Sequence, residues 1–433
     1  MKKERVDFSV MGLLIVIAFA RGFYKTIQYH PAAGFQTNFT PASMAQRPRF
    51  QSDFASSKLH IQTHAASLVE LKNGNLRAFW FSGSREGARD VEIHSAVFDP
   101  KSNKWSAEQV VATRQDTEKS VLRYVSKLGN PVCARASDGK LWLFYVTVSL
   151  GGWSGSSLTM KTSSDEGKTW SAAQRLVTSP FLNVSTLLKG TPFFYKDGTV
   201  GLPVYQEFIQ KFAEILHFDR NGNVIDLQRL SAGKDEGLQP VILAKSTFEA
   251  LALMRNSGEK EPQHVLAVST KDGGRHWTTP QKLPLLNPDS ALSVIVLPDR
   301  RILAVVNNQK RQGISKGRDA LALMISADDG KSWKMVYRLE NQLAARENPL
   351  NKTTYLNNVR KQLLQLAPDS QREEYAQSTA SAMCIGDDCG FEYSYPYLIQ
   401  TRNGDFHLAY TWNRSFIKHV WFNQAWIDQR LKQ

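Results

Sequence analysis

The chain has 433 residues, 42% of them hydrophobic, and a formal net charge of +14. This composition is typical of a globular protein with a large buried core, and it excludes a disordered or collagen-like chain. A basic surface favours acidic partners such as an acidic glycan. The sequence contains no dense Lys/Arg block and no nucleic-acid motif, so we expect no nucleic-acid partner and interpret most of the excess charge as solvated surface.

The first twenty residues predict export. They begin with the basic segment 1–5, continue with the apolar run 8–20 and end in Ala18-Phe19-Ala20. Thirteen apolar residues are too few to span a bilayer, which needs about 20. The pattern is typical of a secretory signal cleaved after Ala20, with an uncleaved membrane anchor as the alternative, because Arg21 is a poor cleavage context. In either case we expect the body, after an N-terminal segment at 21–57, to lie in the periplasm or outside the cell.

The rest of the chain repeats one unit, a tight turn followed by an apolar strand. Clear turns lie at 73–74, 138–139, 197–198 and 403–404, and weaker copies lie at 246–254 and 299–301. Asn-Gly and Asp-Gly between apolar runs are the strongest short-range hairpin signals. The turns recur about every 50 to 65 residues, except for a gap of 104 between Arg300 and Gly404. Residues 340–390 in that gap are polar and partly helical in character, and removing them leaves six regular units.

A second pattern follows the first in phase. Residues 163–170, 270–277 and 326–333 read Ser/Thr-x-Asp-x-Gly-x-x-Trp, and 98–105 is a degenerate copy. These Asp boxes look catalytic, but a structural role is the better interpretation. The Asp and Ser side chains can bond to the backbone of a tight turn, the glycine can adopt positive φ, and the tryptophan can pack below the hairpin.

Together the repeats predict an all-β fold, a single six-bladed β-propeller over residues 58–433. Residues 340–390 would form a partly helical insertion and a candidate lid. We expect a strand from within 47–63 to complete the last blade, because closing the ring protects the edges of its sheets.

The three cysteines have separate interpretations. Cys384 and Cys389 are spaced closely enough for a local disulfide in an oxidising compartment. A metal site would need further ligands, and none lies nearby, so we expect no metal and no cofactor. Cys133 lies in a strand-like stretch and is interpreted as a buried thiol.

The Asp boxes on a six-unit repeat resemble the sialidase (neuraminidase) superfamily of BNR-repeat proteins over about residues 58–430. The resemblance implies three arginines that hold the substrate carboxylate, a tyrosine nucleophile activated by a glutamate, and an aspartate acid/base. Arg318 matches the third arginine, eight residues before Ser326, and Arg255 matches the second. Tyr395 best matches the nucleophile, with Tyr393 as the alternate.

Two positions depart from that pattern. His64 occupies the place of the first arginine, and Gln239 occupies the place of the activating glutamate. Glutamine cannot take a proton from tyrosine, whereas His64 is a candidate acid or base near neutral pH. In the loop after Phe81, Glu86 and Asp90 are the candidates for the acid/base.

The resemblance therefore implies an exported exo-glycosidase that acts on a terminal acidic sugar. The catalytic candidates are Tyr395, Glu86, Asp90 and His64, and the binding candidates are Arg255, Arg318, Gln239 and Tyr393. We expect them to meet in one electropositive pocket at the centre of the ring. The alternatives are an acidic-sugar lyase and a non-catalytic propeller that binds an acidic glycan or a protein. The arginines can also pair with loop carboxylates, and the tyrosines can belong to the core.

Overall fold

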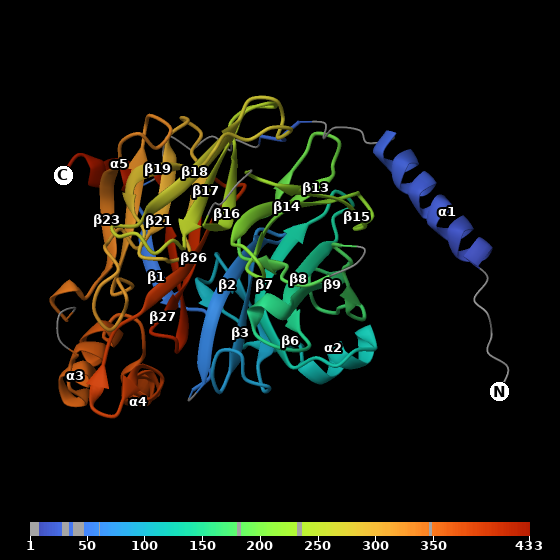
Figure 1. The fold of residues 1–433 in the computed structure, drawn as a ribbon. Coiled ribbons are helices and arrows are strands. Elements are labelled where there is room, and N and C mark those ends of the chain that lie inside the picture. The colour runs from blue at the N-terminus through green and yellow to red at the C-terminus, as the bar shows by residue number, and fades with distance from the viewer. Residues whose placement is uncertain are drawn as a thin grey trace.

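The computed structural model describes residues 8–27, 34–37, 47–59, 61–179, 183–231, 236–345 and 349–433. The predicted fold is confirmed: the described chain forms six antiparallel sheets of four or five strands, arranged as a six-bladed β-propeller (Figure 1). The first strands of neighbouring blades contact one another, as β2 does with β7 and β26. They therefore surround the centre of the ring.

The strands of the blades follow one another along the chain. The first three blades contain β2 (Gln62–Glu70), β3 (Leu76–Gly83), β4 (Glu92–Asp99), β5 (Lys104–Trp105) and β6 (Gln109–Ala112); β7 (Lys127–Arg135), β8 (Leu141–Val148), β9 (Ser156–Ser163) and β10 (Gln174–Arg175); and β11 (Leu187–Leu188), β12 (Phe193–Phe194), β13 (Val200–Gln206), β14 (Phe212–Phe218) and β15 (Val224–Arg229). The last three contain β16 (Gly237–Ala244), β17 (Ala250–Asn256), β18 (His264–Thr270) and β19 (Gln281–Leu286); β20 (Ser293–Val296), β21 (Ile302–Val306), β22 (Ala320–Ser326) and β23 (Lys334–Asn341); and β26 (Tyr393–Gln400), β27 (Phe406–Trp412) and β28 (Phe416–Phe422). Helix α2 (Arg114–Val121) joins the first two blades, and α5 (Gln424–Leu431) follows the last.

The sixth blade is completed by β1 (Phe50–Phe54), which pairs antiparallel with β28 from Phe50↔Phe422 to Phe54↔Lys418. In Figure 1 the blue β1 lies beside the red strands of the C-terminal blade. The predicted ring closure from within 47–63 is confirmed. Arg49 reinforces it, because its Nη1 lies 2.8 Å from Asp405 Oδ2 and its guanidinium lies 4.2 Å from the centroid of the Trp421 ring.

The Asp boxes stabilise corners of the blades. In the box at 163–170 the N–H of Gly167 donates to Ser163 Oγ at 2.8 Å, and the N–H of Thr169 donates to Asp165 Oδ1 at 2.9 Å. The indole of Trp170 donates to the Gly167 carbonyl at 3.1 Å. The same bonds recur in the other two complete boxes. Their structural interpretation is therefore confirmed.

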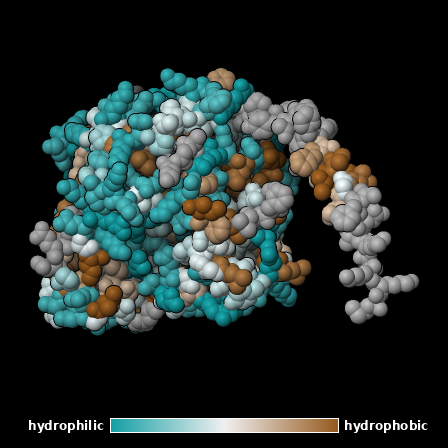
Figure 2. Space-filling model, viewed as in Figure 1, coloured by the Kyte–Doolittle hydropathy of each residue, from teal (hydrophilic) through white to brown (hydrophobic). Residues whose placement is uncertain are grey.

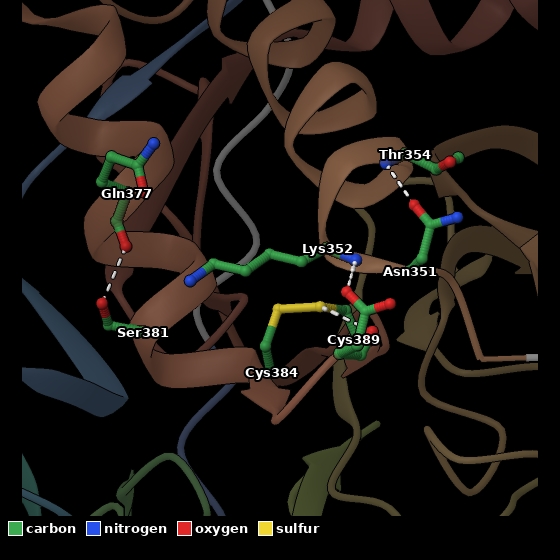
Figure 3. Close-up of a disulfide and its surroundings, with 8 residues drawn as sticks. Asn351, Lys352, Thr354, Gln377, Ser381, Cys384 and Cys389 are labelled. Carbon is green, nitrogen blue, oxygen red and sulfur yellow. Dashed lines mark hydrogen bonds between the residues drawn. A yellow bond between two sulfur atoms is a disulfide. The ribbon is translucent and has the colours of Figure 1, made fainter.

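The insertion is partly helical, with α3 (Lys352–Leu363) and α4 (Arg372–Met383) followed by the short pair β24 (Cys384–Ile385) and β25 (Asp388–Cys389). Figure 3 shows the Cys384–Cys389 disulfide that closes this pair; the two Cα atoms are 4.2 Å apart, so the predicted bridge is confirmed. The helices pack on the sixth blade, where the rings of Tyr375 and Phe416 stack at 4.6 Å. Cys133 is a buried free thiol, as predicted.

The N-terminal apolar run lies in α1 (Phe8–Ile27), whose exposed apolar side chains are brown in Figure 2. Among the described residues, no helix is both long and apolar enough to cross a membrane. After α1, Phe35 is completely buried, and its N–H donates to the Thr247 carbonyl at 2.8 Å. Thr247 lies in the turn between β16 and β17, at the end of the blades opposite the site described below.

Candidate functional site

The innermost strands of four blades share a local irregularity. The pairing register of β2, β7, β16 and β26 with their neighbours shifts near the start of each strand. In three of these bulges Ala65, Gln239 and Tyr395 adopt positive φ angles of 56°, 51° and 54°. A bulge redirects side chains out of the regular alternation, and bulges are common beside active sites. Here they turn residues of several blades toward the central axis.

A cavity of about 180 Å³ lies at this end of the blades. Its walls are formed by Glu86, Asn130, Val146, Trp153, Leu187, Tyr205, Glu207, Arg255 and Tyr395. These residues come from five of the six blades. Three predicted site residues, Glu86, Arg255 and Tyr395, therefore line one central cavity. Among the described residues, none of the insertion at 340–390 lines it, so this part of the insertion is not a lid over the cavity in this structure.

Tyr395 lies between His64 and Gln239. The centroids of the His64 and Tyr395 rings are 4.3 Å apart. The side-chain amide of Gln239 lies 3.4 Å from the Tyr395 hydroxyl and 3.2 Å from the Tyr205 hydroxyl, and donates to both. Its carbonyl accepts from Arg255 Nη1 at 3.3 Å, which orients the amide. Gln239 thus occupies the expected position beside the tyrosine, but it offers an N–H where a base would offer an oxygen.

The arginines each face a carboxylate. Arg255 Nε lies 2.6 Å from Asp289 Oδ1. Arg318 Nη2 donates to the Asp289 main-chain carbonyl at 2.8 Å, and its Nη1 lies 3.5 Å from Glu392 Oε1. Arg414 Nε lies 2.7 Å from Glu392 Oε2. Glu392 thus joins Arg318 to a third arginine, and Asp289 joins Arg318 to Arg255. These two carboxylates offset part of the charge of the three arginines, and the electropositive pocket stays a prediction.

The repeats seen in the sequence and in the blades match a known family. The model of the BNR repeat-like domain matches residues 74–408, most of the chain. The chain belongs to the BNR repeat-like family. The predicted resemblance to sialidases is confirmed at the level of this superfamily.

Solved structures share the fold of this BNR repeat-like protein at low sequence identity. The Hadza microbial sialidase Hz136 is 15% identical with a TM-score of 0.60, over 84% of this chain and 66% of the sialidase. The intramolecular trans-sialidase of Ruminococcus gnavus is 13% identical with a TM-score of 0.57, over 92% and 99% of the two chains. A Dyadobacter fermentans protein of unknown function is 12% identical with a TM-score of 0.60, over 86% and 98%. No curated protein matches the sequence.

Arg414 and Glu392 were missed by the sequence analysis of this BNR repeat-like protein. Arg414 lies in the turn between β27 and β28, and its carbonyl accepts from the N–H of Thr63 at 2.7 Å. Its backbone is therefore next to His64, where the superfamily would place its first arginine. The only signal in the sequence is a polar turn, Asn413-Arg414, after a buried strand.

The pKa values of Glu392 and Glu86, two carboxyl groups of the site, shift in opposite directions. Burial opposes the ionisation of Glu392, but Arg318 and Arg414 outweigh it and hold its pKa at about 2. Burial raises the pKa of Glu86, and Arg414 only partly opposes this rise. Glu392 is therefore an ion that orients arginines, whereas Glu86 retains a proton more readily than an exposed glutamate.

Two buried bases lie near Tyr395. Burial lowers the pKa of His64 to about 3, so this side chain is neutral near pH 7 and is a poor proton donor there. Burial lowers the pKa of Lys189 to about 7. Lys189 Nζ donates to the Pro396 carbonyl at 3.0 Å and lies 6.0 Å from the Tyr395 ring centroid. Lys189 thus supports the bulge that presents Tyr395.

Two of the predicted site residues, Asp90 and Tyr393, lie away from the cavity. The carboxylate of Asp90 accepts from the N–H and the hydroxyl of Ser84, both at 2.9 Å, and this exposed residue does not line the cavity. Tyr393 is completely buried and its hydroxyl donates to Gln362 Oε1 at 2.9 Å in the insertion. Because the bulge separates the two tyrosines, Tyr393 faces the core and Tyr395 faces the cavity.

Proposed function

We propose that this protein is an exported, sialidase-like exo-glycosidase that removes a terminal acidic sugar from a glycan. The cavity shared by Tyr395, Glu86 and Arg255 is the observation that carries this proposal. Chemically it combines an oxygen that can approach an anomeric carbon, a carboxyl group with a raised pKa and a cation for an acidic substituent.

Glu86 is the proposed general acid. A proton donor in glycoside cleavage must be protonated when the substrate binds and must deliver its proton to the departing oxygen. Burial favours the protonated form of Glu86. Raising the pKa of a carboxyl group by burial is an established way to obtain such a donor.

The arginines are the proposed site for the carboxylate of the sugar. Guanidinium groups bind carboxylates through paired, charge-assisted hydrogen bonds. The Nε atom of Arg318 is buried and makes no hydrogen bond within the described chain. This Nε atom is enclosed by protein, so a substrate would contact Arg318 through the 17% of its side chain that remains exposed.

Tyr395 is proposed to stabilise the positive charge that develops at the anomeric carbon. Its neighbour Gln239 cannot take its proton, and the low pKa of His64 makes that ring a weak base. Neither neighbour therefore activates Tyr395 as a nucleophile in the way that a glutamate would. We expect slow turnover compared with an enzyme that has a carboxylate at this position.

Release of the fluorophore from a fluorogenic sialoside by the full chain tests the proposal. We expect measurable turnover that falls at least about 100-fold in Tyr395→Phe and in Glu86→Gln, in keeping with the size of general acid catalysis. Glu373→Gln, on the exposed insertion, is the control and should leave turnover unchanged. Equal rates in all four proteins would overturn the proposal. Binding of the sialoside without any turnover would favour a non-catalytic glycan-binding propeller, which the neutral Gln239 also suits.

A further inference from the structure

The cavity has two chemically different sides. On the side of the second and third blades, Val146, Trp153 and Leu187 supply apolar surface beside the polar groups of Asn130, Tyr205 and Glu207. The other side carries Arg255, which is linked through Asp289 to Arg318. A ligand that fills this cavity therefore meets the arginine on one side and a mixed surface that includes three apolar side chains on the other.

The apolar side continues outward onto two loops. The loop between β8 and β9 contributes Trp153 to the cavity and exposes 77% of Leu150. The loop between β13 and β14 contributes Glu207 to the cavity and exposes 52% of Phe208 and 85% of Ile209. Single exposed apolar residues are common, but three on adjacent loops that also form a cavity wall are typical of a binding surface.

The proposed acid lies on this same side. Glu86 lines the cavity together with Trp153, and a Cβ atom at the next residue, Gly87, would lie 3.9 Å from Trp153 Cζ2. Lys127 also contacts the Trp153 ring, because its Nζ lies 5.0 Å from the ring centroid in a cation–π arrangement. The oxygen that Glu86 protonates is the one that joins the sugar to the rest of the substrate. The remainder of the substrate must therefore leave the cavity beside Trp153.

We infer that the group attached to the acidic sugar is apolar, an alkyl or lipid-like aglycone that lies across Leu150, Phe208 and Ile209. This inference rests on the proposed function and specifies its substrate class. Burial of methylene groups against these side chains supplies the affinity, at roughly a fourfold gain for each fully buried group. The arginines hold the sugar, and the loops select what the sugar is attached to.

Titration calorimetry of the full chain with two α-sialosides of one sugar, the methyl and the octyl glycoside, tests this. We expect the octyl glycoside to bind at least about tenfold more tightly. Leu150→Ser and Ile209→Ser should each remove a large part of that gain and leave the affinity for the methyl glycoside unchanged. Phe248→Ser is the matched control, because Phe248 is 60% exposed but lies in the turn between β16 and β17, at the opposite end of the blades. It should change neither affinity.

The possible failures are distinguishable. Equal affinities for the two glycosides in the unmodified protein would overturn the inference and leave the proposed function standing. An octyl gain that survives both loop substitutions would place the apolar contact elsewhere, and would also overturn it. Failure of both glycosides to bind would overturn the proposed function, and this inference with it.

Discussion

The side-chain amide of Gln239 donates to the Tyr395 hydroxyl across 3.4 Å, at the position where a sialidase would have a glutamate. The amide is oriented by Arg255, which donates to its carbonyl. The tyrosine oxygen therefore accepts a hydrogen bond from this neighbour and cannot transfer its proton to it. This contact limits the chemistry we expect of the site.

Gln239→Glu should increase turnover of a fluorogenic sialoside by about 100-fold or more, because it places a base within reach of Tyr395. The measurement is kcat at neutral pH, compared with Gln239→Ala, which removes the amide without adding a base. A Gln239→Glu protein that is folded, binds the sialoside and remains as slow as Gln239→Ala would show that proton transfer from Tyr395 does not limit the reaction.

Glu392→Gln should lower the free energy of unfolding by about 3 kcal/mol, because it removes the buried carboxylate that the partly buried Arg318 and Arg414 share. Urea denaturation measures this loss. The control is Glu373→Gln, which breaks an exposed, solvent-screened ion pair with Arg360 and should leave the free energy of unfolding nearly unchanged. Losses of similar size in the two variants would contradict a structural role for Glu392.

The buried pair His407 and His419 should make the protein less stable as the pH falls below about 6.5. Their ring nitrogens are 3.0 Å apart, and burial lowers the pKa of His419 to about 3 and that of His407 well below 6.5. The unfolded chain therefore binds protons that the folded chain excludes. The contribution of the two neutral histidines to the free energy of unfolding is fully present above pH 6.5. It is lost as the pH falls toward 3, by up to about 1.4 kcal/mol per pH unit for each histidine.

Urea denaturation at pH 7, 6, 5 and 4 of the natural chain and of His419→Gln checks this effect. The variant should show a shallower loss between pH 6.5 and 4. The comparison is necessary because Glu214 has the opposite effect on stability. Burial raises its pKa to about 7, so protonation of Glu214 stabilises the folded protein as the pH falls from 7 toward 4.5. Parallel stability curves for the two proteins would contradict the assignment to His419.

Reduction of the Cys384–Cys389 bridge should cost about 2 kcal/mol of stability, the loop-closure entropy of a short loop in the unfolded chain. Urea denaturation with and without a phosphine reductant measures it. The double variant Cys384→Ser/Cys389→Ser should be insensitive to the reductant, since Cys133 is a buried free thiol. A reductant effect that persists in that variant would rule out the bridge as its source.

The fold could be predicted from the sequence because its signals are local. Each hairpin turn and each Asp box is contained in a few consecutive residues, and the bonds of Gly167 and Thr169 to their own box show why the pattern suffices. Tyr395 and Arg255 could be predicted because each was located by its distance from such a landmark.

The rest of the site depends on how blades meet, which local sequence does not encode. Arg255 pairs with Asp289 in the connection between the fourth and fifth blades, and Arg414 pairs with Glu392 across the strands of the sixth blade, contacts that the spacing of the turns does not reveal. Glu86 and Asp90 could not be distinguished in the sequence, because only the loop conformation turns one carboxyl group to the cavity and the other to Ser84.

The most direct test of the account is calorimetric titration of methyl α-sialoside into the full chain and into Arg318→Ala. Arg318 donates to the Asp289 main-chain carbonyl, lies 3.5 Å from the Glu392 carboxylate and is one of the arginines proposed to hold the substrate carboxylate. We predict binding by the natural chain and at least about 30-fold weaker binding by the variant, the effect of losing a charged hydrogen-bonded contact. A folded Arg318→Ala protein that binds the sialoside as tightly as the natural chain would contradict the account.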